Sequence, residues 1–323
     1  MSIITTKNEI YSRIEKYGII PTVKLHDENA AAPLAEALAS AGLDIAEIDL
    51  EIGQAARSIR KIAGNFPDML IIAGGAATED QVKSAVDSGA KIIAARGPVK
   101  NAALYCVKNN IPIIIECGTP EEIKKAADAG VKIILWPFAK NKTPAPKYPG
   151  VKYVLRGGVI TGGELPELLL CDDVIACEVS HICEESFISA REFGRIKNLA
   201  SGLIYKMLGF DFSHVVINCE NGEQAEQYAG KIESIFGLAK TDGENSVSNA
   251  GILEFMKAKS YGRNGQIAFS TDFMDRALFY LKKNGKEFIE ESARFGENGE
   301  MLSIYLDSII GGFAFKLVNK QNK

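Results

Sequence analysis

Short apolar runs alternate with amphipathic stretches along the first two thirds of the chain. The runs start about every 20 to 26 residues, the length of one strand followed by one helix. Eight occur: Ile19–Leu25, Leu43–Leu50, Met69–Gly75, Lys91–Gly97, Pro112–Gly118, Lys132–Phe138, Lys152–Gly158 and Asp172–Glu178. Because they are nearly continuous in apolar residues, they predict the strands of a parallel sheet covered by helices.

The stretches between these runs have helical periodicity. ENAAAPLAEALASAG and TEDQVKSAVDSGA carry apolar residues three and four positions apart and reach a glycine at the end. Eight such units in about 200 residues predict a compact (β/α)8 TIM barrel. An open doubly wound sheet is the competing topology, but the chain has no GxGxxG fingerprint for it.

The pattern changes near Gly209, after the helical stretch EFGRIKNLASGLIYKM. A strand, a helix and short strands follow, and the same order then repeats, which predicts an α+β domain of paired βαβββ modules. We therefore expect two domains, a barrel over residues 1–208 and a second domain over residues 209–323.

Charge and composition narrow the function classes. With 37 Lys+Arg against 41 Asp+Glu, the net charge of −4 provides no basic field for nucleic acid. No apolar run reaches the roughly 18 residues that a membrane span needs. The N-terminus has the periodicity of an amphipathic helix, and the six cysteines form no CxxC pair. These features predict a cytoplasmic protein with buried thiols and no nucleic-acid or membrane partner.

The barrel segments resemble the class I aldolase family of 2-keto-3-deoxy-6-phosphogluconate and 4-hydroxy-2-oxoglutarate aldolases. The resemblance covers about residues 8–205 and rests on IIPTVK, AEIDLE, LIIAGGAATEDQVKSAVDSGAKII, IPIIIECGTPEEIKKAADAGVKII and LRGGVI, in the family's order and spacing. It implies a lyase that makes or breaks a C–C bond in a small anionic 2-oxo acid. It also implies a homo-oligomer.

The resemblance further implies a catalytic pair, of which this chain keeps one member. The family uses a lysine on the sixth strand as a Schiff-base nucleophile and a glutamate on the second strand to move protons. Glu47 matches the glutamate, whereas Ile134 stands at the lysine position. Lys132, two residues earlier, and Lys24, at the end of the first strand, are the candidate replacements.

Charged residues gather at the predicted C-terminal ends of the strands, where barrel active sites lie. They are Lys24, Glu47, Asp49, Glu51, Arg96, Glu116, Arg156 and Glu178. Arg96 and Arg156 are candidates to bind a substrate carboxylate, together with Glu51, Glu116 and Glu178 around the pocket. Glu178 and Val179 replace the strand-eight glycines of the family's phosphate site, so we expect weak phosphosugar binding.

Three interpretations of this charged ring stay open. In the first, Lys24 acts as a relocated imine-forming lysine. In the second, two or three of the glutamates hold a divalent metal that polarises a 2-oxo acid, the candidates being Glu47, Glu51, Glu116 and Glu178. In the third, the ring is a salt-bridge network in a catalytically degenerate binding or regulatory paralogue. No cofactor is certain, and a divalent metal is the candidate.

Residues 210–323 resemble the vicinal-oxygen-chelate (glyoxalase-like) fold, which implies metal ligands at four strand positions. His214, Glu254 and Gln266 occupy three of them, but Lys316 occupies the fourth, and a protonated lysine repels a metal ion. The alternative interpretation, which we favour, is an oligomerisation or regulatory module.

Two loop histidines and a basic loop are the remaining candidates near the barrel mouth. His26 follows the first strand and His181 follows the eighth, each a candidate general acid or base. The segment KNKTPAPKYPG, with Lys140, Lys142 and Lys147, predicts a loop in place of the helix after strand six, because its prolines interrupt a helix.

Overall fold

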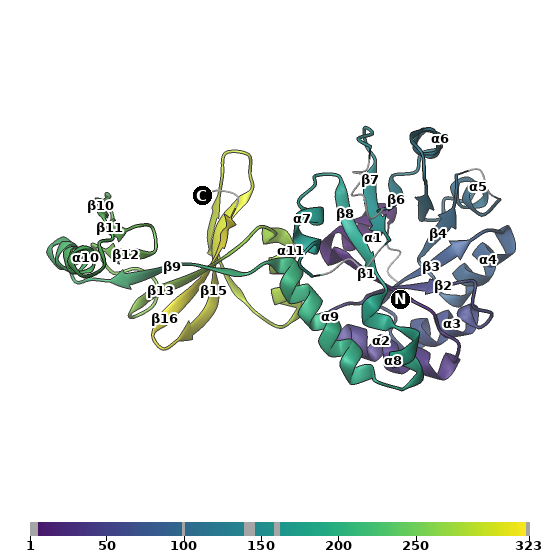
Figure 1. The fold of residues 1–323 in the computed structure, drawn as a ribbon, viewed down its shortest axis with the longest axis horizontal. Coiled ribbons are helices and arrows are strands. Elements are labelled where there is room, and N and C mark those ends of the chain that lie inside the picture. The colour runs from purple at the N-terminus through teal and green to yellow at the C-terminus, as the bar shows by residue number, and fades with distance from the viewer. Residues whose placement is uncertain (1–5, 99–100, 139–145, 158–161, 321–323) are drawn as a thin grey trace. The chain divides into compact units, whose positions relative to one another are not determined.

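The computed structural model describes residues 6–98, 101–138, 146–157 and 162–320. The chain divides into two compact units, Met1–Met207 and Leu208–Lys323. Figure 1 traces both in chain order.

The first unit is a closed barrel of eight strands in sequential order, each parallel to its neighbours. The predicted (β/α)8 fold is therefore confirmed, and every predicted strand is present. The strands are β1 Ile19–Val23, β2 Ile45–Asp49, β3 Leu70–Ala76, β4 Ile92–Arg96, β5 Ile113–Glu116, β6 Ile133–Pro137, β7 Lys152–Arg156 and β8 Val174–Val179.

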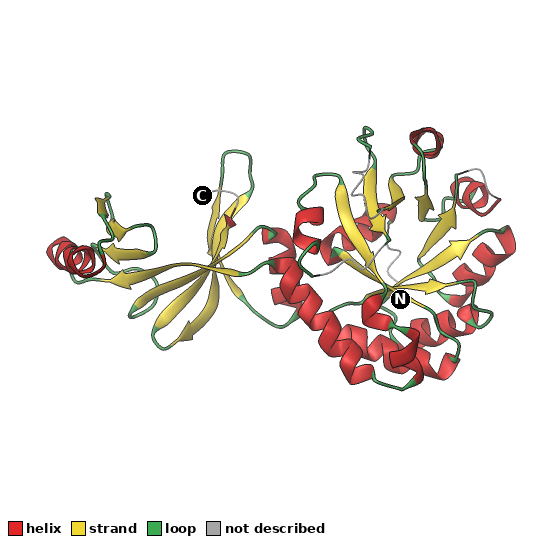
Figure 2. Cartoon of the chain, viewed as in Figure 1, coloured by secondary structure: helices red, strands yellow, loops and turns green. Residues whose placement is uncertain are grey.

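Helices surround the barrel and carry the local signals that the sequence contains (Figure 2). They are α1 Lys7–Tyr17, α2 Ala31–Ser40, α3 Ala55–Asn65, α4 Glu79–Ser88, α5 Asn101–Lys108, α6 Pro120–Asp128, α7 Leu165–Leu169, α8 Glu185–Ser189 and α9 Phe193–Leu208, with 3-10 turns Glu28–Ala30 and His181–Cys183. Helix α1 begins with a Thr6–Glu9 capping box and ends at Gly18, whose φ of 66° is the left-handed geometry that glycine accepts.

The basic loop after β6 is only partly described. Lys140 and Lys142 lie outside the described residues, whereas Lys147 lines a cavity beside β7 and α7. The described residues between β6 and β7 contain no helix.

The second unit is an eight-stranded mixed sheet in the order β10-β11-β12-β9-β13-β16-β15-β14. Its elements are β9 Asp211–Asn218, α10 Gly222–Phe236, β10 Lys240–Asp242, β11 Ser246–Asn249, β12 Leu253–Met256, β13 Gly265–Thr271, α11 Met274–Lys283, β14 Phe288–Phe295, β15 Met301–Ile310 and β16 Phe313–Asn319. This is the predicted pair of βαβββ modules.

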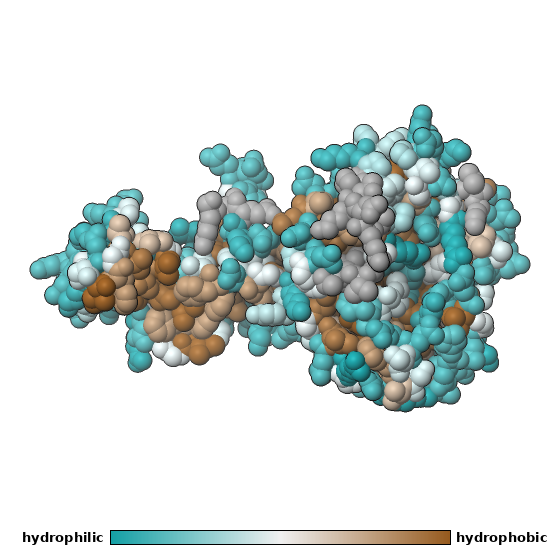
Figure 3. Space-filling model, viewed as in Figure 1, coloured by the Kyte–Doolittle hydropathy of each residue, from teal (hydrophilic) through white to brown (hydrophobic). Residues whose placement is uncertain are grey.

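Helix α10 covers one part of this sheet through a small core that contains Ala225, Ala229, Val247 and Phe255. Elsewhere apolar side chains reach the surface, and Figure 3 shows them around β13 and β16. Phe269, which stacks on Phe315, is one of these exposed residues. Of the described helices, none has the length and apolar character that a bilayer crossing requires.

Candidate active site at the barrel mouth

The C-terminal ends of the barrel strands surround a cavity of about 620 Å³. Strand register brings the charged residues together: Glu47 on β2 lies beside Thr22, Glu178 on β8 beside Ile20, and Arg96 on β4 beside Glu116 on β5. The predicted residues that line this cavity are Lys24, Glu47, Asp49, Arg96, Arg156 and Glu178. The sequence therefore identified most of its charged wall.

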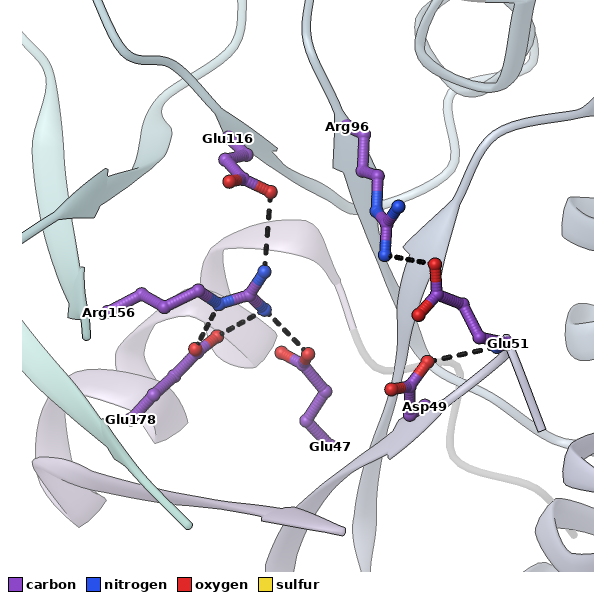
Figure 4. A network of polar contacts seen from close by, with 7 residues as sticks. All are labelled: Glu47, Asp49, Glu51, Arg96, Glu116, Arg156 and Glu178. Atoms are coloured by element: carbon purple, nitrogen blue, oxygen red, sulfur yellow. Dashed lines mark hydrogen bonds and ion pairs between the residues drawn. The ribbon is translucent and has the colours of Figure 1, made fainter. Parts of the chain in front are cut away.

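Arg156 lies at the centre of an acidic ring that Glu47, Glu116 and Glu178 form (Figure 4). Its guanidinium forms a bidentate pair with Glu178, donates to Glu47 at 2.7 Å and lies 3.3 Å from the Glu116 carboxylate. Burial and the three carboxylates act in opposite directions on this group, and the carboxylates raise the pKa of Arg156 above its ordinary value. Every nitrogen of this side chain thus has a carboxylate partner.

Glu47 is a buried carboxyl, 5% exposed, as is Glu178 at 6%. Desolvation by burial and then the nearby Glu178 raise the pKa of Glu47 well above its usual range, while Arg156 opposes the shift. Its Oε1 accepts from Arg156, but its buried Oε2 has no partner among the described groups. Glu47 is therefore a buried carboxyl that keeps its proton to a higher pH than an exposed glutamate does.

Gly74 on β3 makes room for this carboxyl. A Cβ at residue 74 would lie 2.2 Å from Glu47 Oε1 and 2.7 Å from its Cγ. Gly74 was not among the predicted site residues, although the AGG run of β3 is a sequence signal for it.

Arg96 differs from Arg156 in having one carboxylate partner. It pairs with Glu51 at 2.5 Å, and Asp49 Oδ1 accepts from the Glu51 backbone amide at 2.9 Å (Figure 4). The Arg96 side chain is 43% exposed, against 29% for Arg156. A second cavity of about 430 Å³ lies between β4 and β5, and both arginines line it as well. Arg96 thus keeps donors available to both cavities.

Lys24 is the amine of the large cavity, and among its described lining residues no other lysine occurs. Its side chain is 54% exposed and its ammonium lies 3.9 Å from Glu185. Glu185, at the start of α8, also pairs with His26 at 3.0 Å. Glu185 was not among the predicted site residues, and its only sequence signal is its place shortly after strand eight.

Strand β6 carries no amine on either of its faces. Ile134 lies beside Ile115 and Tyr153, whereas Glu116 lies beside Leu135. Since paired residues point to the same side of a sheet, Leu135 rather than Ile134 shares the face of Glu116. Lys132 lines a separate cavity with Lys7 and Tyr11, before β6 begins, and so lies at the opposite end of the barrel.

The acidic ring does not fit a divalent cation. Glu47, Glu116 and Glu178 all hold the Arg156 guanidinium, and Glu51 is paired with Arg96. A metal ion bound by these oxygens would have to replace or repel a permanently charged arginine. No group of three or more metal-ligating side chains is present in the described part of the chain.

The thiols and the second loop histidine near the mouth are buried to different extents. Burial raises the pKa of the Cys117 thiol to about 12, with Glu122 and Glu116 adding to the effect. Cys177 is also buried, and burial lowers the pKa of His181. None of the six cysteines forms a disulfide, and Cys171 is exposed rather than buried as predicted.

In the second unit, His214, Glu254 and Gln266 already have hydrogen-bond partners. Ser213 Oγ lies 3.0 Å from His214 Nδ1, Ser246 donates to Glu254 at 2.5 Å, and Gln266 Oε1 accepts from Tyr305. Register places His214 and Lys316 on either side of Ala268, on one face of the sheet. With a lysine at the fourth position, this donor set does not fit a divalent cation.

The barrel is similar in sequence to two known enzymes. The chain is 29% identical over 211 residues to the 2-dehydro-3-deoxy-phosphogluconate aldolase of Haemophilus influenzae, covering 62% of this chain and 97% of that one. It is 27% identical to the Treponema pallidum enzyme of the same name, over 59% of this chain and 94% of that one.

Solved structures show the same fold. The KDPG aldolase of Legionella pneumophila, with pyruvate captured as a covalent carbinolamine, aligns with a TM-score of 0.56 and 24% identity, covering 62% of this chain and 98% of that one. The Zymomonas mobilis enzyme with 3-phosphoglycerate gives 0.56 and 20%, over 61% and 96%. The sequence profile of the family described as KDPG and KHG aldolase matches residues 10–199, and the chain belongs to this family.

Proposed function

We propose that the barrel is an aldolase-type lyase for a small 2-oxo acid, with Lys24 as the imine-forming amine and Glu47 as the proton carrier. The observation that carries this proposal is Glu47: a buried carboxyl with a raised pKa, on the wall of the cavity that Lys24 also lines. A family member from Legionella pneumophila forms a carbinolamine with pyruvate, which supports amine chemistry here.

In the proposed reaction, an iminium group accepts the electron pair of the broken C–C bond. The neutral amine of Lys24 adds to C2 of the substrate, and the carbinolamine loses water to form an iminium. Cleavage of the C3–C4 bond sends its electron pair into the iminium, giving an enamine, while the C4 hydroxyl loses its proton and becomes a carbonyl. Protonation at C3 and hydrolysis then release the shortened 2-oxo acid and Lys24.

Glu47 supplies and removes the protons of these steps. Its raised pKa keeps a proton on the carboxyl in the range where an exposed glutamate has lost it, so it can protonate the departing carbinolamine hydroxyl. Arg96, with donors left over from Glu51, is the residue we assign to the substrate carboxylate. Arg156 instead positions Glu47 and Glu178.

The surroundings of the cavity favour a substrate without a phosphate group. Glu178, Glu184 and Glu185 line the part of the wall that β8 and the following turn contribute. A phosphate dianion there would meet carboxylates, of which Glu178 is matched by Arg156 and Glu185 by Lys24. We therefore propose a short hydroxy-substituted 2-oxo acid.

Borohydride reduction in the presence of pyruvate, followed by peptide mapping, tests this assignment. We expect a pyruvate adduct on Lys24 that Lys24→Ala abolishes and that the control Lys132→Ala retains. An adduct on any other lysine, Lys140 or Lys142 included, would exclude Lys24 as the nucleophile. Activity without an adduct, abolished by a chelator, would replace the imine by a metal route.

A binding or regulatory paralogue is the second candidate function. The observation that favours it is the full set of carboxylate partners around Arg156, since such a network also fills a barrel without chemistry. Its signature would be a pyruvate-dependent rise in melting temperature without an adduct and without cleavage of 4-hydroxy-2-oxo acids.

For the second unit we propose a glyoxalase-like domain over residues 209–323 that serves binding or assembly rather than metal catalysis. Its paired βαβββ modules support the fold assignment. A cytoplasmic homo-oligomer remains part of the proposal, and analytical ultracentrifugation of the full chain tests the oligomer.

A further inference from the structure

One face of the second-unit sheet holds a polar cluster at the four positions where the fold resemblance implies metal ligands. Glu254 and Gln266 both lie beside Val216, one on each neighbouring strand. Their oxygens accept from Ser246 and Tyr305, and Lys316 stands where a fourth ligand would be. The cluster therefore contains the ammonium group of Lys316 where the fold resemblance implies a metal ligand.

Lys316 has no carboxylate partner among the described residues, and its ammonium lies over the Tyr305 ring, 5.4 Å from the ring centroid. Desolvation by burial lowers its pKa, Arg294 lowers it further, and Glu254 opposes the shift. Arg294 lies opposite Ser303, two residues before Tyr305, so both cations are on this face. A half-buried ammonium beside a second cation is a place where an anion is favoured.

An aromatic surface adjoins the two cations. Tyr261 stacks on Tyr305 with ring centroids 4.3 Å apart and an interplanar angle of 29°. Tyr305 is buried and held by its hydrogen bond to Gln266, whereas Tyr261 remains 41% exposed. The exposed ring can extend this stack with a further planar group.

We infer that this face binds a small planar organic carboxylate, with Lys316 and Arg294 on the carboxylate and Tyr261 against the planar body. The site replaces the metal centre that the fold resemblance implies. A 2-oxo acid belongs to the same chemical class, so one kind of ligand would be recognised in both units.

Isothermal titration calorimetry of the full chain with benzoate as the probe tests this inference. Benzamide, which has the same ring but no charge, is the ligand control. We expect benzoate to bind and benzamide to bind much more weakly. Lys316→Met should weaken benzoate binding by about tenfold or more, the loss of roughly 1.4 kcal/mol of charge-assisted contact.

Matched variants show whether the probe binds at this face or elsewhere on the chain. Lys231 is the control lysine, because its ammonium also lies over a tyrosine ring, at 5.8 Å from that of Tyr228 on α10. Lys231→Met should bind benzoate as the unmodified chain does, Lys316→Arg should retain most of the affinity, and Arg96→Met reports any binding of benzoate in the barrel. Should Lys316→Met fail to fold, Arg294→Met takes its place.

Several results would overturn the inference. They are equal affinity for benzamide, no benzoate binding, unchanged binding in both cation variants, or a loss confined to Arg96→Met, which would put the probe in the barrel. A Zn²⁺ titration adds one more: stoichiometric binding that Glu254→Gln abolishes would restore the metal site.

Discussion

Arg156 in the barrel and Lys316 in the second unit are both partly buried cations at the centre of a polar cluster, but their partners differ. Three carboxylates contact the Arg156 guanidinium, whereas Lys316 rests against a tyrosine ring and has no carboxylate within 4.0 Å among the described residues. The first cluster is saturated by its own side chains, and the second is not.

This difference separates a cation that organises a site from a cation that is available to a ligand. In the barrel, the arginine fixes the carboxyl groups of its three glutamate partners and is itself fully paired. In the second unit, the cation is itself the available group. Removing each cation should therefore have opposite consequences for the stability of the unit that holds it.

The largest effect is expected for Glu47→Gln. Cleavage of a 4-hydroxy-2-oxo acid, measured as pyruvate release, should fall by about 10²- to 10⁴-fold because glutamine cannot transfer the proton. Since glutamine keeps the size of the side chain and can still accept from Arg156, thermal unfolding near pH 4, where residue 47 is uncharged in both chains, should change little. Full turnover in this variant would remove Glu47 from the mechanism and leave the barrel cluster with a structural role only.

Arg156→Met and Lys316→Met form the next test. Arg156→Met leaves Glu47 and Glu178 buried without their cation, which should lower the free energy of unfolding by roughly 3–5 kcal/mol. Lys316→Met removes a poorly solvated ammonium and should leave stability unchanged or raise it, within about 1 kcal/mol.

Urea titrations followed separately by Trp136, which lies in the barrel, and by far-ultraviolet circular dichroism measure both effects. If the two variants were destabilised equally, Lys316 would have partners as strong as those of Arg156. The contrast between the clusters would then fail.

The pH dependence of barrel stability gives a smaller effect with a definite sign. Because folding raises the pKa of Glu47, the folded chain binds a proton that the unfolded chain has released above the ordinary value of 4.5. Glu47 therefore costs stability as the pH rises from that value to its folded pKa, by about 1.4 kcal/mol for each unit of the shift.

Unfolding of Glu47→Gln between pH 4 and pH 8 tests this sign. As the pH rises, the free energy of unfolding of the variant should increase relative to that of the unmodified chain. This difference should level off above the pKa that Glu47 has in the folded chain. A difference that shrinks with rising pH would mean that the Arg156 contact outweighs burial.

The barrel was predictable from sequence because each strand is a separate apolar run, and all of them except β6 end at or beside a glycine or a charged residue. The charged residues of the site were predictable because the C-terminal ends of the strands were predictable. The residues at or near these ends are Glu47, Arg96, Glu116, Arg156 and Glu178. Their partners were not predictable. Whether Arg156 binds a substrate carboxylate or three protein carboxylates depends on rotamers across four strands, which no spacing encodes.

Strand parity was also beyond the sequence pattern. A buried strand such as Ile133–Trp136 is apolar on both faces, so its residues do not reveal which of Ile134 and Leu135 shares the face of Glu116. Glu185 escaped for another reason: it lies in a short helix after β8, where nothing in the sequence indicates that it meets Lys24 and His26.

The smallest expected effect on stability sharpens the comparison within the barrel itself. Arg96 and Glu51 are a largely exposed pair, so Arg96→Met should change the free energy of unfolding by less than about 1 kcal/mol. If Arg96 binds the substrate carboxylate, the same variant should raise KM by about tenfold while changing kcat little, because a contact present throughout the reaction has been lost. Steady-state kinetics measure this effect. Glu51→Gln, which removes the carboxylate partner of Arg96 but keeps the arginine, is the control variant. A fall in kcat with an unchanged KM would instead assign Arg96 to the transition state, and the carboxylate would need another partner.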